Sequence, residues 1–396
     1  EYNFLMNLAQ IAKRFIFSSK NFSYTNISLF LSITTFSLSV AISLIVMGVS
    51  RSYKNDIEFR LQSVEPDLKI VSKNSNFLDS ITEDEILLKL DSLLENNPNI
   101  EYSTFREDYL MIKSSGLSKG LLSLSLDKHP SLFYDFIEMD SSLDSYFYVS
   151  SNFYENNYLD LNQSLTLFNI QEMIENESIK ANTHLVSGTF TSNLPIFDKN
   201  VIFISPKFHS TLYADNQQST GVVINGIVDS EINILKNEFF YKSLDFITWR
   251  DKHQNTLYWL TIFTNPIYLI IIFMVSLSII YQLFANWLLI YDKSNSLYKL
   301  KIIGISNNKI KTINMYIAIT ILLISLILGY LIAISLSILQ NNFSIISVDP
   351  SIYIVAELSS DILFSDMIFI SIISFISVIA STLLLHNKKK ALYSKK

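Results

Sequence analysis

Long stretches without a charged side chain divide the chain into apolar and polar parts. Residues 21–50 contain no Asp, Glu, Lys or Arg, and neither do residues 256–291. A helix needs about 20 apolar residues to cross the ~30 Å hydrocarbon core of a bilayer, and both stretches exceed that length. Two further uncharged stretches follow later in the chain. We therefore predict four transmembrane helices, at residues 27–49, 257–291, 312–339 and 367–385.

Residues 51–255 form a polar segment between the first two predicted transmembrane helices. Within it, apolar residues recur at helical spacing in 82–94, where Thr82 is the expected N-cap and acidic residues follow in the first turn. Shorter β-branched and aromatic runs indicate strands. The predicted helices are 82–94, 152–161, 208–213 and 230–241, and the predicted strands are 164–169, 185–190, 201–204 and 222–228. The expected fold is therefore an α-helical membrane protein with a large α+β domain inserted between its first and second helices.

Residues 1–20 carry apolar side chains at helical spacing, at Phe4, Leu8, Ile11 and Phe15. This pattern predicts an amphipathic helix lying in the membrane interface. A cleaved signal peptide is the alternative. Charged residues interrupt its apolar run, however, and it lacks a small-residue cleavage site.

The distribution of lysine and arginine predicts the orientation of the membrane helices. Every Lys or Arg outside 51–255 lies in residues 1–20, in the loop 292–311 or in the tail 386–396, whereas the loop 340–366 carries only acidic charges. Because basic loops stay in the cytoplasm, we expect both termini to be cytoplasmic. The α+β domain and the short loop 340–366 would then be extracytoplasmic.

Composition narrows the range of functions. The mean hydropathy is +0.30 and only 17% of residues are charged, which is typical of a mixed membrane and soluble protein. Residues 51–255 hold 30 acidic and 17 basic residues, a net charge of −13 (17 − 30), which argues against a nucleic acid partner. The chain has no cysteine, which excludes disulfides, cysteine-ligated zinc and thiol nucleophiles within it.

Residues suited to catalysis or cofactor binding are sparse. The eight glycines form no G-x-x-x-x-G-K-[ST] phosphate loop, so we expect ATP hydrolysis to reside on another chain. Acid pairs such as Glu107–Asp108 and Asp79–Glu83 are interpreted as solvated faces rather than as a glycosidase pair. The histidines lack metal-ligand spacing, and we predict packing or surface roles for them. They are His129, His184, His209, His253 and His386. No catalytic residue and no metal site is predicted.

Hydroxyl side chains are frequent in the first predicted transmembrane helix. They belong to Ser32, Thr34, Thr35, Ser37, Ser39 and Ser43. Small polar residues can line a helix–helix seam in a membrane, because they allow close approach and hydrogen bonding across it. The alternative is that each hydroxyl simply donates to a carbonyl of its own helix.

A series of short stretches matches the order and spacing found in one transporter family. IAKRFIFSSKNFSYTNIS and MGVSRSYKNDIEFRLQSVEPDLKI border the first predicted helix, TWRDKHQNTLYWL leads into the second, and VDPSIYIVAELSSDI lies in the loop 340–366. VSSNFYENNYLDLNQSLTLF and HLVSGTFTSNLPIFDKNVIFISP lie within the α+β domain. Together with the layout of one helix, a large domain and three helices, they resemble ABC transporter permeases of the MacB/FtsX/LolC type. The similarity is greatest to the lipoprotein-releasing LolC and LolE permeases and implies a MacB-like periplasmic core for the domain.

The loop 292–311 is the expected docking point for an ATPase. SLYKLKIIGISNNKIKTINMY, from Ser296 to Tyr316, is similar to the family segment that receives the ATPase stroke, although Ser296 stands where the family has Glu. Its apolar ridge, its cations and a terminating glycine suit a short helix. The predicted ATPase-coupling residues are Ser296, Leu297, Tyr298, Leu300, Lys301, Ile303 and Gly304. The alternative is a basic turn held by anionic lipid.

An arm that follows the T-L-F strand hooks a periplasmic lipoprotein carrier in LolC-like permeases. The corresponding stretch here is residues 169–182, where Met173, Ile174 and Ile179 are the predicted carrier contacts. The alternative is a structural hairpin without a partner.

The resemblance implies the permease subunit of an ATP-driven MacB-type transporter in a bacterial inner membrane. Such a subunit would extract lipoproteins and pass them to a LolA-like periplasmic carrier. The implied partners are a separate ABC ATPase that holds ATP and Mg²⁺, a second permease chain, the lipoprotein substrate and membrane lipid. No cofactor is expected on this chain itself. A MacB-like efflux permease and an FtsX-like division-signalling protein are the alternatives.

Overall fold

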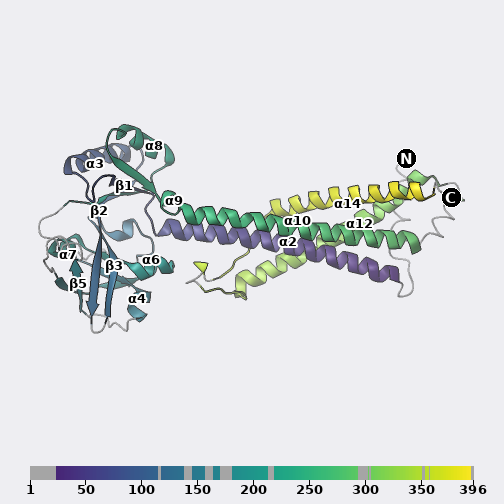
Figure 1. Ribbon diagram of the computed structural model, residues 1–396, viewed down its shortest axis with the longest axis horizontal. Coiled ribbons are helices and arrows are strands. Elements are labelled where there is room, and N and C mark those ends of the chain that lie inside the picture. The colour runs from purple at the N-terminus through teal and green to yellow at the C-terminus, as the bar shows by residue number, and fades with distance from the viewer. Residues whose placement is uncertain are drawn as a thin grey trace. The chain divides into compact units, whose positions relative to one another are not determined.

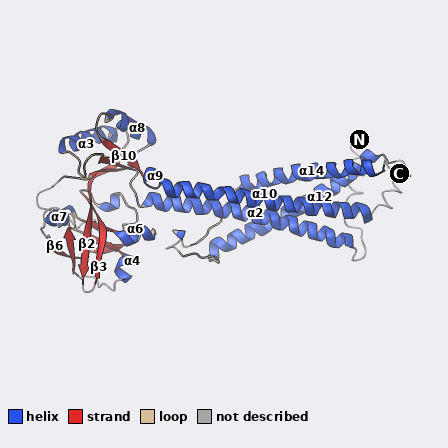
Figure 2. Cartoon of the chain, viewed as in Figure 1, coloured by secondary structure: helices blue, strands red, loops and turns tan. Residues whose placement is uncertain are grey.

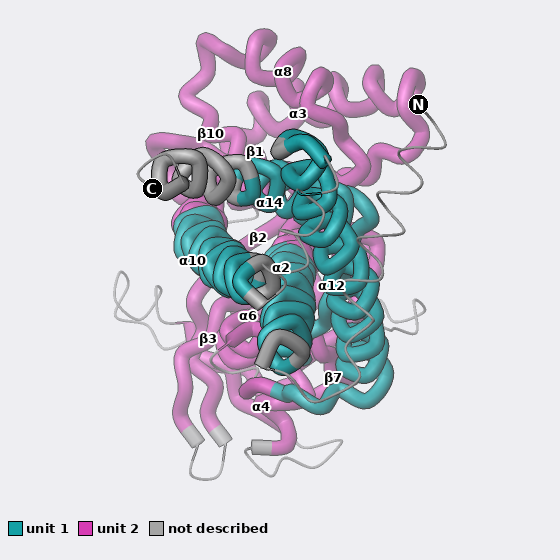
Figure 3. Tube along the Cα trace, turned by 90° about the vertical axis from the view of Figure 1, so that its right-hand side faces the viewer, with its two compact units in different colours: residues 1–54, 260–347, 357–396 teal, residues 55–259, 348–356 magenta. Residues whose placement is uncertain are grey.

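The computed structural model describes residues 24–114, 117–137, 145–156, 164–169, 181–212, 218–292, 302, 305–349, 353–355 and 357–393. The chain forms two compact units, shown in teal and magenta in Figure 3. We call residues 1–54, 260–347 and 357–396 the helical unit. Residues 55–259 and 348–356 make up the sheet unit.

Four long helices account for most of the described part of the helical unit (Figure 1). They are α2 (Tyr24–Ser63), α10 (Gln254–Asp292), α12 (Asn307–Phe343) and α14 (Phe364–Tyr393). Three segments are long and apolar enough to cross a membrane: Ile27–Ser63, Gln254–Ala285 and Asn308–Phe343. The apolar segment Phe364–Ala380 in α14 is shorter. The chain thus has helices that could span a membrane together with a mixed sheet domain, whereas the number of crossings and their topology stay predictions.

Helix α2 extends well beyond the predicted membrane segment. It continues without a break from Tyr24 to Ser63, and its last residues belong to the sheet unit. Pro66 follows closely, and because proline disfavours helical geometry in the residue before it, the helix cannot continue through Glu65. Helix α10 likewise begins within the sheet unit, at Gln254.

Helix α2 packs against α12 and α14 through buried side chains that include Phe36, Leu44, Leu322 and Ile370. The closest approach involves Gly329 of α12. A Cβ atom there would lie 2.8 Å from the Ser37 carbonyl oxygen and 2.9 Å from Val40 Cβ. The two backbones can therefore come this close only because residue 329 has no side chain.

The hydroxyl residues of α2 fit both interpretations in part. Ser32, Ser37, Ser39 and Ser43 are buried, as a small-residue seam requires. However, the hydroxyls of Thr34, Thr35 and Ser37 donate to carbonyl oxygens of α2 itself. For these three residues, hydrogen bonding within the helix is confirmed.

The sheet unit is built on one ten-stranded sheet with the path β10-β1-β9-β2-β3-β8-β4-β7, and β5 pairs with both β2 and β6. The strands are β1 (Leu68–Ser72), β2 (Glu101–Ser114), β3 (Leu117–Leu126), β4 (Phe147–Ser150), β5 (Ser164–Asn169), β6 (Ala181–Leu185), β7 (Gly188–Phe190), β8 (Val201–Ile204), β9 (Gly221–Asn225) and β10 (Leu244–Thr248). The helices are α3 (Ser80–Leu94), α4 (Ser151–Asn156), α6 (Pro195–Asn200), α7 (Pro206–Leu212), α8 (Asp229–Glu238) and α9 (Trp249–Lys252). A 3₁₀ turn, η1, spans Pro130–Leu132.

Separate apolar cores form along the sheet. At one end, α3 and α8 lie beside the part of the sheet that carries β10 (Figure 2), and their residues Ile86 and Leu235 pack on Ile70 of β1 and Val222 of β9. Farther along, a second core joins β2, β4, β5 and β8. Strand β2 pairs with β9 at its start and with β3 and β5 toward its end. It is therefore the strand that links the two cores.

Several predicted elements of the domain are confirmed. Strands β5 and β8 have the predicted bounds, and helices α3, α4, α7 and α8 lie where helical patterns were found. The amphipathic helix predicted at residues 1–20 lies outside the described residues and stays a prediction. The same holds for the ends of two predicted helices of the domain, residues 157–161 and residue 213.

Other predictions about the domain were wrong. The predicted strand 185–190 is broken at 186–187 and divided between β6 and β7, which have different partners. The predicted strand 222–228 ends at Asn225, because Gly226 turns the chain with φ of +72°. Asp79, rather than Thr82, caps α3 and accepts a hydrogen bond from the Thr82 backbone. Acid pair Asp79–Glu83 therefore includes a helix cap.

Replacing Gly329 with alanine tests the close packing of α2 and α12. The added Cβ atom would overlap the α2 backbone, and we expect the Gly329→Ala protein in detergent to lose about 1–3 kcal/mol of stability. Gly120→Ala is the matched control, because no atom lies within 4 Å of a Cβ there. The measurement is the fraction of protein that remains monodisperse after heating to a series of temperatures, which gives a midpoint temperature for each variant. Equal midpoint temperatures for Gly329→Ala and Gly120→Ala would contradict the packing described.

Candidate functional site

The residues predicted from the sequence to bind partners all lie outside the described residues. These are the ATPase-coupling residues Ser296, Leu297, Tyr298, Leu300, Lys301, Ile303 and Gly304, and the carrier-hook residues Met173, Ile174 and Ile179. Both assignments stay predictions. The described residues instead bring together a cluster of charges in the sheet unit that the sequence did not reveal.

Glu65 lies at the centre of this cluster. It sits between the end of α2 and the start of β1, and its side chain is only 6% exposed. A carboxylate buried to this extent needs charged or hydrogen-bonding partners, because losing its hydration is costly. Two lysines supply them, and they come from opposite ends of the domain sequence.

Lys252 and His253 reach Glu65 from the other junction, where β10 leads into α10. Thr248 ends β10 and caps the short helix α9, with Asp251 completing a capping box. This turn places Lys252 Nζ 2.6 Å from Glu65 Oε1. His253 Nε2 is 3.8 Å from the same oxygen, which is too long for a hydrogen bond but close enough for an electrostatic interaction.

Lys69 extends the cluster into the sheet. Its Nζ lies 3.3 Å from Glu65 Oε2 and 3.5 Å from Glu107 Oε2, and it sits over the Phe105 ring at 5.4 Å from the centroid. Lys69 is on β1, while Glu107 and Phe105 are on β2. Glu65, Lys69, Glu107, Lys252 and His253 are called the junction cluster below.

The pKa values within the junction cluster favour the charged forms. Burial alone would raise the pKa of Glu65, but the charge of Lys69, the neighbouring His253 side chain and the charge and hydrogen bond of Lys252 outweigh it and lower the pKa to about 2. Burial would likewise lower the pKa of Lys69, but attraction to Glu65 raises it above its ordinary value. Both shifts favour the charged forms of Glu65 and Lys69 at neutral pH. The arrangement is suited to holding chain segments together.

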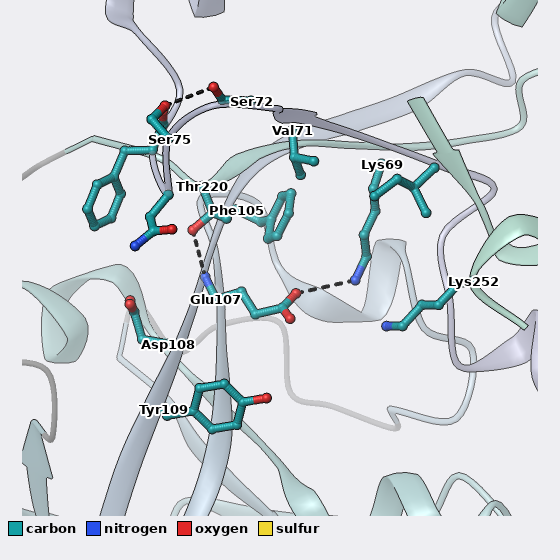
Figure 4. A pocket seen from close by; sticks show the side chains of 13 residues that line it. Lys69, Val71, Ser72, Ser75, Phe105, Glu107, Asp108, Tyr109, Thr220 and Lys252 are labelled. Atoms are coloured by element: carbon teal, nitrogen blue, oxygen red, sulfur yellow. Dashed lines mark hydrogen bonds and ion pairs between the residues drawn. The ribbon is translucent and has the colours of Figure 1, made fainter. Parts of the chain in front are cut away.

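A cavity of about 690 Å³ borders the junction cluster (Figure 4). Figure 4 shows Lys69 and Glu107 pointing toward each other, with Lys252 beside them. The remaining wall is formed by residues of β1, β2 and β10, by residues of the loop after β1 and by the residue that precedes β9. They are Val71, Phe105, Ile247, Tyr109, Phe77, Ser72, Ser75, Asn76, Asp108 and Thr220. The volume is in the usual range for ligand pockets.

Asp108 and His209 form a second buried polar contact next to this cavity. His209 Nε2, on α7, is 2.7 Å from Asp108 Oδ2 on β2, and both side chains are buried. The interpretation of Glu107–Asp108 as a solvated acid pair was therefore wrong. Each carboxylate has a basic partner from a distant part of the sequence, which a local pattern cannot show.

The helical unit contains its own polar cluster, formed by α2 and the residues before α14. Arg51 makes two hydrogen bonds to Asp366, at 2.7 and 2.8 Å. The Asp361 backbone N–H donates to the Gly48 carbonyl, and a Cβ atom at Gly48 would lie 2.8 Å from Ser360 Oγ. Arg51, which directly follows the uncharged residues 21–50 of the chain, thus binds the acidic loop 340–366 to α2.

The junction cluster predicts a specific effect of pH on the Glu65→Gln protein. Removing one partner of a buried ion pair typically costs about 3–5 kcal/mol. We expect Glu65→Gln to lower the free energy of unfolding by about that much near neutral pH, measured by the fluorescence of the buried Trp249.

The pH dependence follows from the pKa of Glu65, which is depressed in the folded protein. The stabilisation that the Glu65 carboxylate gives the folded protein is fully present above 4.5, its pKa in the unfolded chain, and is lost as pH falls toward about 2, its pKa in the folded protein. The difference from wild type should therefore be constant above about pH 5 and shrink below 4.5. A difference that grows on acidification would contradict the assignment.

Comparisons with known proteins add no family assignment. No protein-family model matches this sequence, and no curated protein matches it. The resemblance to ABC transporter permeases accordingly depends on the sequence stretches and on the order of helices and domain.

Proposed function

We propose that this chain is the permease subunit of an ATP-driven MacB-type ABC transporter in a bacterial inner membrane. Its substrate would be a lipoprotein, extracted from the membrane and handed to a LolA-like carrier. A dimeric ATPase and a second permease chain complete the proposed assembly. ATP and Mg²⁺ would be held by the ATPase.

The observation that carries the proposal is the insertion of the sheet unit between α2 and α10. One long helix precedes residues 55–259, and α10, α12 and α14 follow. This order agrees with the layout of one helix, a large domain and three helices that the resemblance implies. Three of these helices contain segments that could cross a membrane. Four crossings would place the domain and the loop 340–366 on the side opposite the basic loop 292–311.

The apolar helices also suit a lipid-linked substrate. The four predicted membrane segments contain no Asp, Glu, Lys or Arg, and a path for acyl chains needs apolar walls rather than charges. In this proposal the chain performs no chemistry. It converts closure of the ATPase into movement of α2 and α10, which carry that movement to the sheet unit because they continue into it.

The coupling assignment predicts loss of the ATPase when residues 297–303 are deleted. The tagged full chain would be purified in mild detergent from its native membranes and irradiated with an azido-ATP photoprobe. We expect labelling of a separate co-purified polypeptide, suppressed by excess MgATP, and loss of that polypeptide with the deletion. The permease chain itself should stay unlabelled, because no phosphate loop occurs in its sequence.

The matched control replaces Met173, Ile174 and Ile179 with serine, which alters the predicted carrier contacts only. This variant should keep the labelled polypeptide. If no nucleotide-binding polypeptide accompanies the wild-type chain, the transporter proposal fails. If one remains bound after the deletion, the coupling assignment alone fails.

A further inference from the structure

We infer that Glu65 is a positioning residue that clasps the two chain junctions of the sheet unit, so that the end of α2 and the start of α10 move as one joint. The inference rests on the proposed function for its role in transport. The joint itself is a property of the sheet unit and can be tested separately.

The clasp lies outside the β-ladder that also joins these two parts of the chain. Strands β1 and β10 pair antiparallel from Ser72↔Leu244 to Leu68↔Thr248, and the ladder ends there. Glu65 precedes Leu68 in the chain and Lys252 follows Thr248, so both residues lie just beyond this end of the ladder. Their contact, with Nζ 2.6 Å from Oε1, therefore holds the two junctions where sheet hydrogen bonds no longer do.

A second ion pair connects Glu65, through Lys69, to strand β2 in the middle of the sheet. The other carboxylate oxygen of Glu65 forms an ion pair with Lys69, and Lys69 forms a second ion pair with Glu107 of β2. Because β2 links the two cores, a displacement of the joint acts on the strand that both cores share. Glu65 thus contacts Lys252 of α9, just before α10 begins, and reaches β2 through Lys69.

The burial of Glu65 distinguishes this clasp from the surface ion pairs of the same unit. In the clasp, Glu65 is 6% exposed although Lys252 is 40% exposed, whereas both partners of the Glu85–Lys242 pair, which joins α3 to the turn after α8, are partly exposed, at 47% and 31%. Exposed pairs hold geometry weakly, because water competes for both partners. In the clasp, water competes for Lys252 but has little access to the Glu65 carboxylate, which therefore depends on its charged partners.

The test is a distance measurement across the two junctions in the full chain. The protein has no native cysteine, so Gln62→Cys and Asn255→Cys, both at exposed positions, accept spin labels without background. Double electron–electron resonance in nanodiscs should give one narrow distance distribution for the wild-type background. Lys252→Met removes the closer of the two contacts between the junctions and leaves Glu65 paired with Lys69 and 3.8 Å from His253 Nε2. It should broaden that distribution.

Further variants keep the result interpretable. Glu65→Gln should broaden the distribution at least as much as Lys252→Met, and the double variant should be no broader than Glu65→Gln alone. Glu85→Gln makes the same chemical change in an exposed pair and should leave the distribution unchanged. No ATPase is needed, so a negative result bears on the clasp and leaves the proposed function standing. A Lys252→Met distribution as narrow as that of the wild type would overturn the inference.

Discussion

The structure depends first on the need to keep long apolar helices out of water. Helix α10 exposes large side chains such as Leu269, Ile272 and Phe273, each more than half accessible. Soluble proteins do not leave apolar surface of this extent exposed, and lipid or an apolar partner has to cover it. The segments at Ile27–Ser63, Gln254–Ala285 and Asn308–Phe343 are all long enough to lie in a bilayer. This constraint decides where charges can occur.

The charged pairs of the described residues accordingly lie outside the uncharged stretches 21–50 and 256–291. Arg51 follows the uncharged part of α2 and binds Asp366 at the start of α14. Glu65 and Lys252 lie near the two ends of the domain sequence and form an ion pair in which the Glu65 carboxylate is buried. Inserting a domain between two helices requires both ends of its chain to return to one place. In the sheet unit, the β1–β10 ladder and the junction cluster together meet that requirement.

The sequence was most informative where one physical effect dominates. Absence of charge located the long helices, and short β-branched runs located β5 and β8. The β2–β3 hairpin was not predicted, although Leu122, Leu124 and Leu126 alternate with serines in the two-residue period of a strand. Strand β2 carries polar and charged residues over much of its length, so its pattern is weak.

The junction cluster could not have been predicted from the sequence. Glu65 stands next to Pro66 and resembles any acidic residue at a helix end, and its partner Lys252 lies at the far end of the domain. Only the pairing of β1 with β10 brings them together. A contact set by strand pairing across a whole domain leaves no local pattern. The predicted coupling and hook residues rest on resemblance and not on such contacts.

The depth of α10 in a lipid bilayer tests the account most directly. Trp259 and Trp287 are 28 positions apart (287 − 259) on this helix, or about 42 Å at 1.5 Å per residue, which matches the ~40–45 Å between the two interfaces of a bilayer. Single-tryptophan proteins in vesicles of lipids brominated at defined depths would report each position by fluorescence quenching. Trp259 and Trp287 should be quenched most by shallow bromines, and a tryptophan introduced by Phe273→Trp by deep ones. Equal, weak quenching at all three positions would show that α10 does not cross the bilayer, and the proposed arrangement would fail with it.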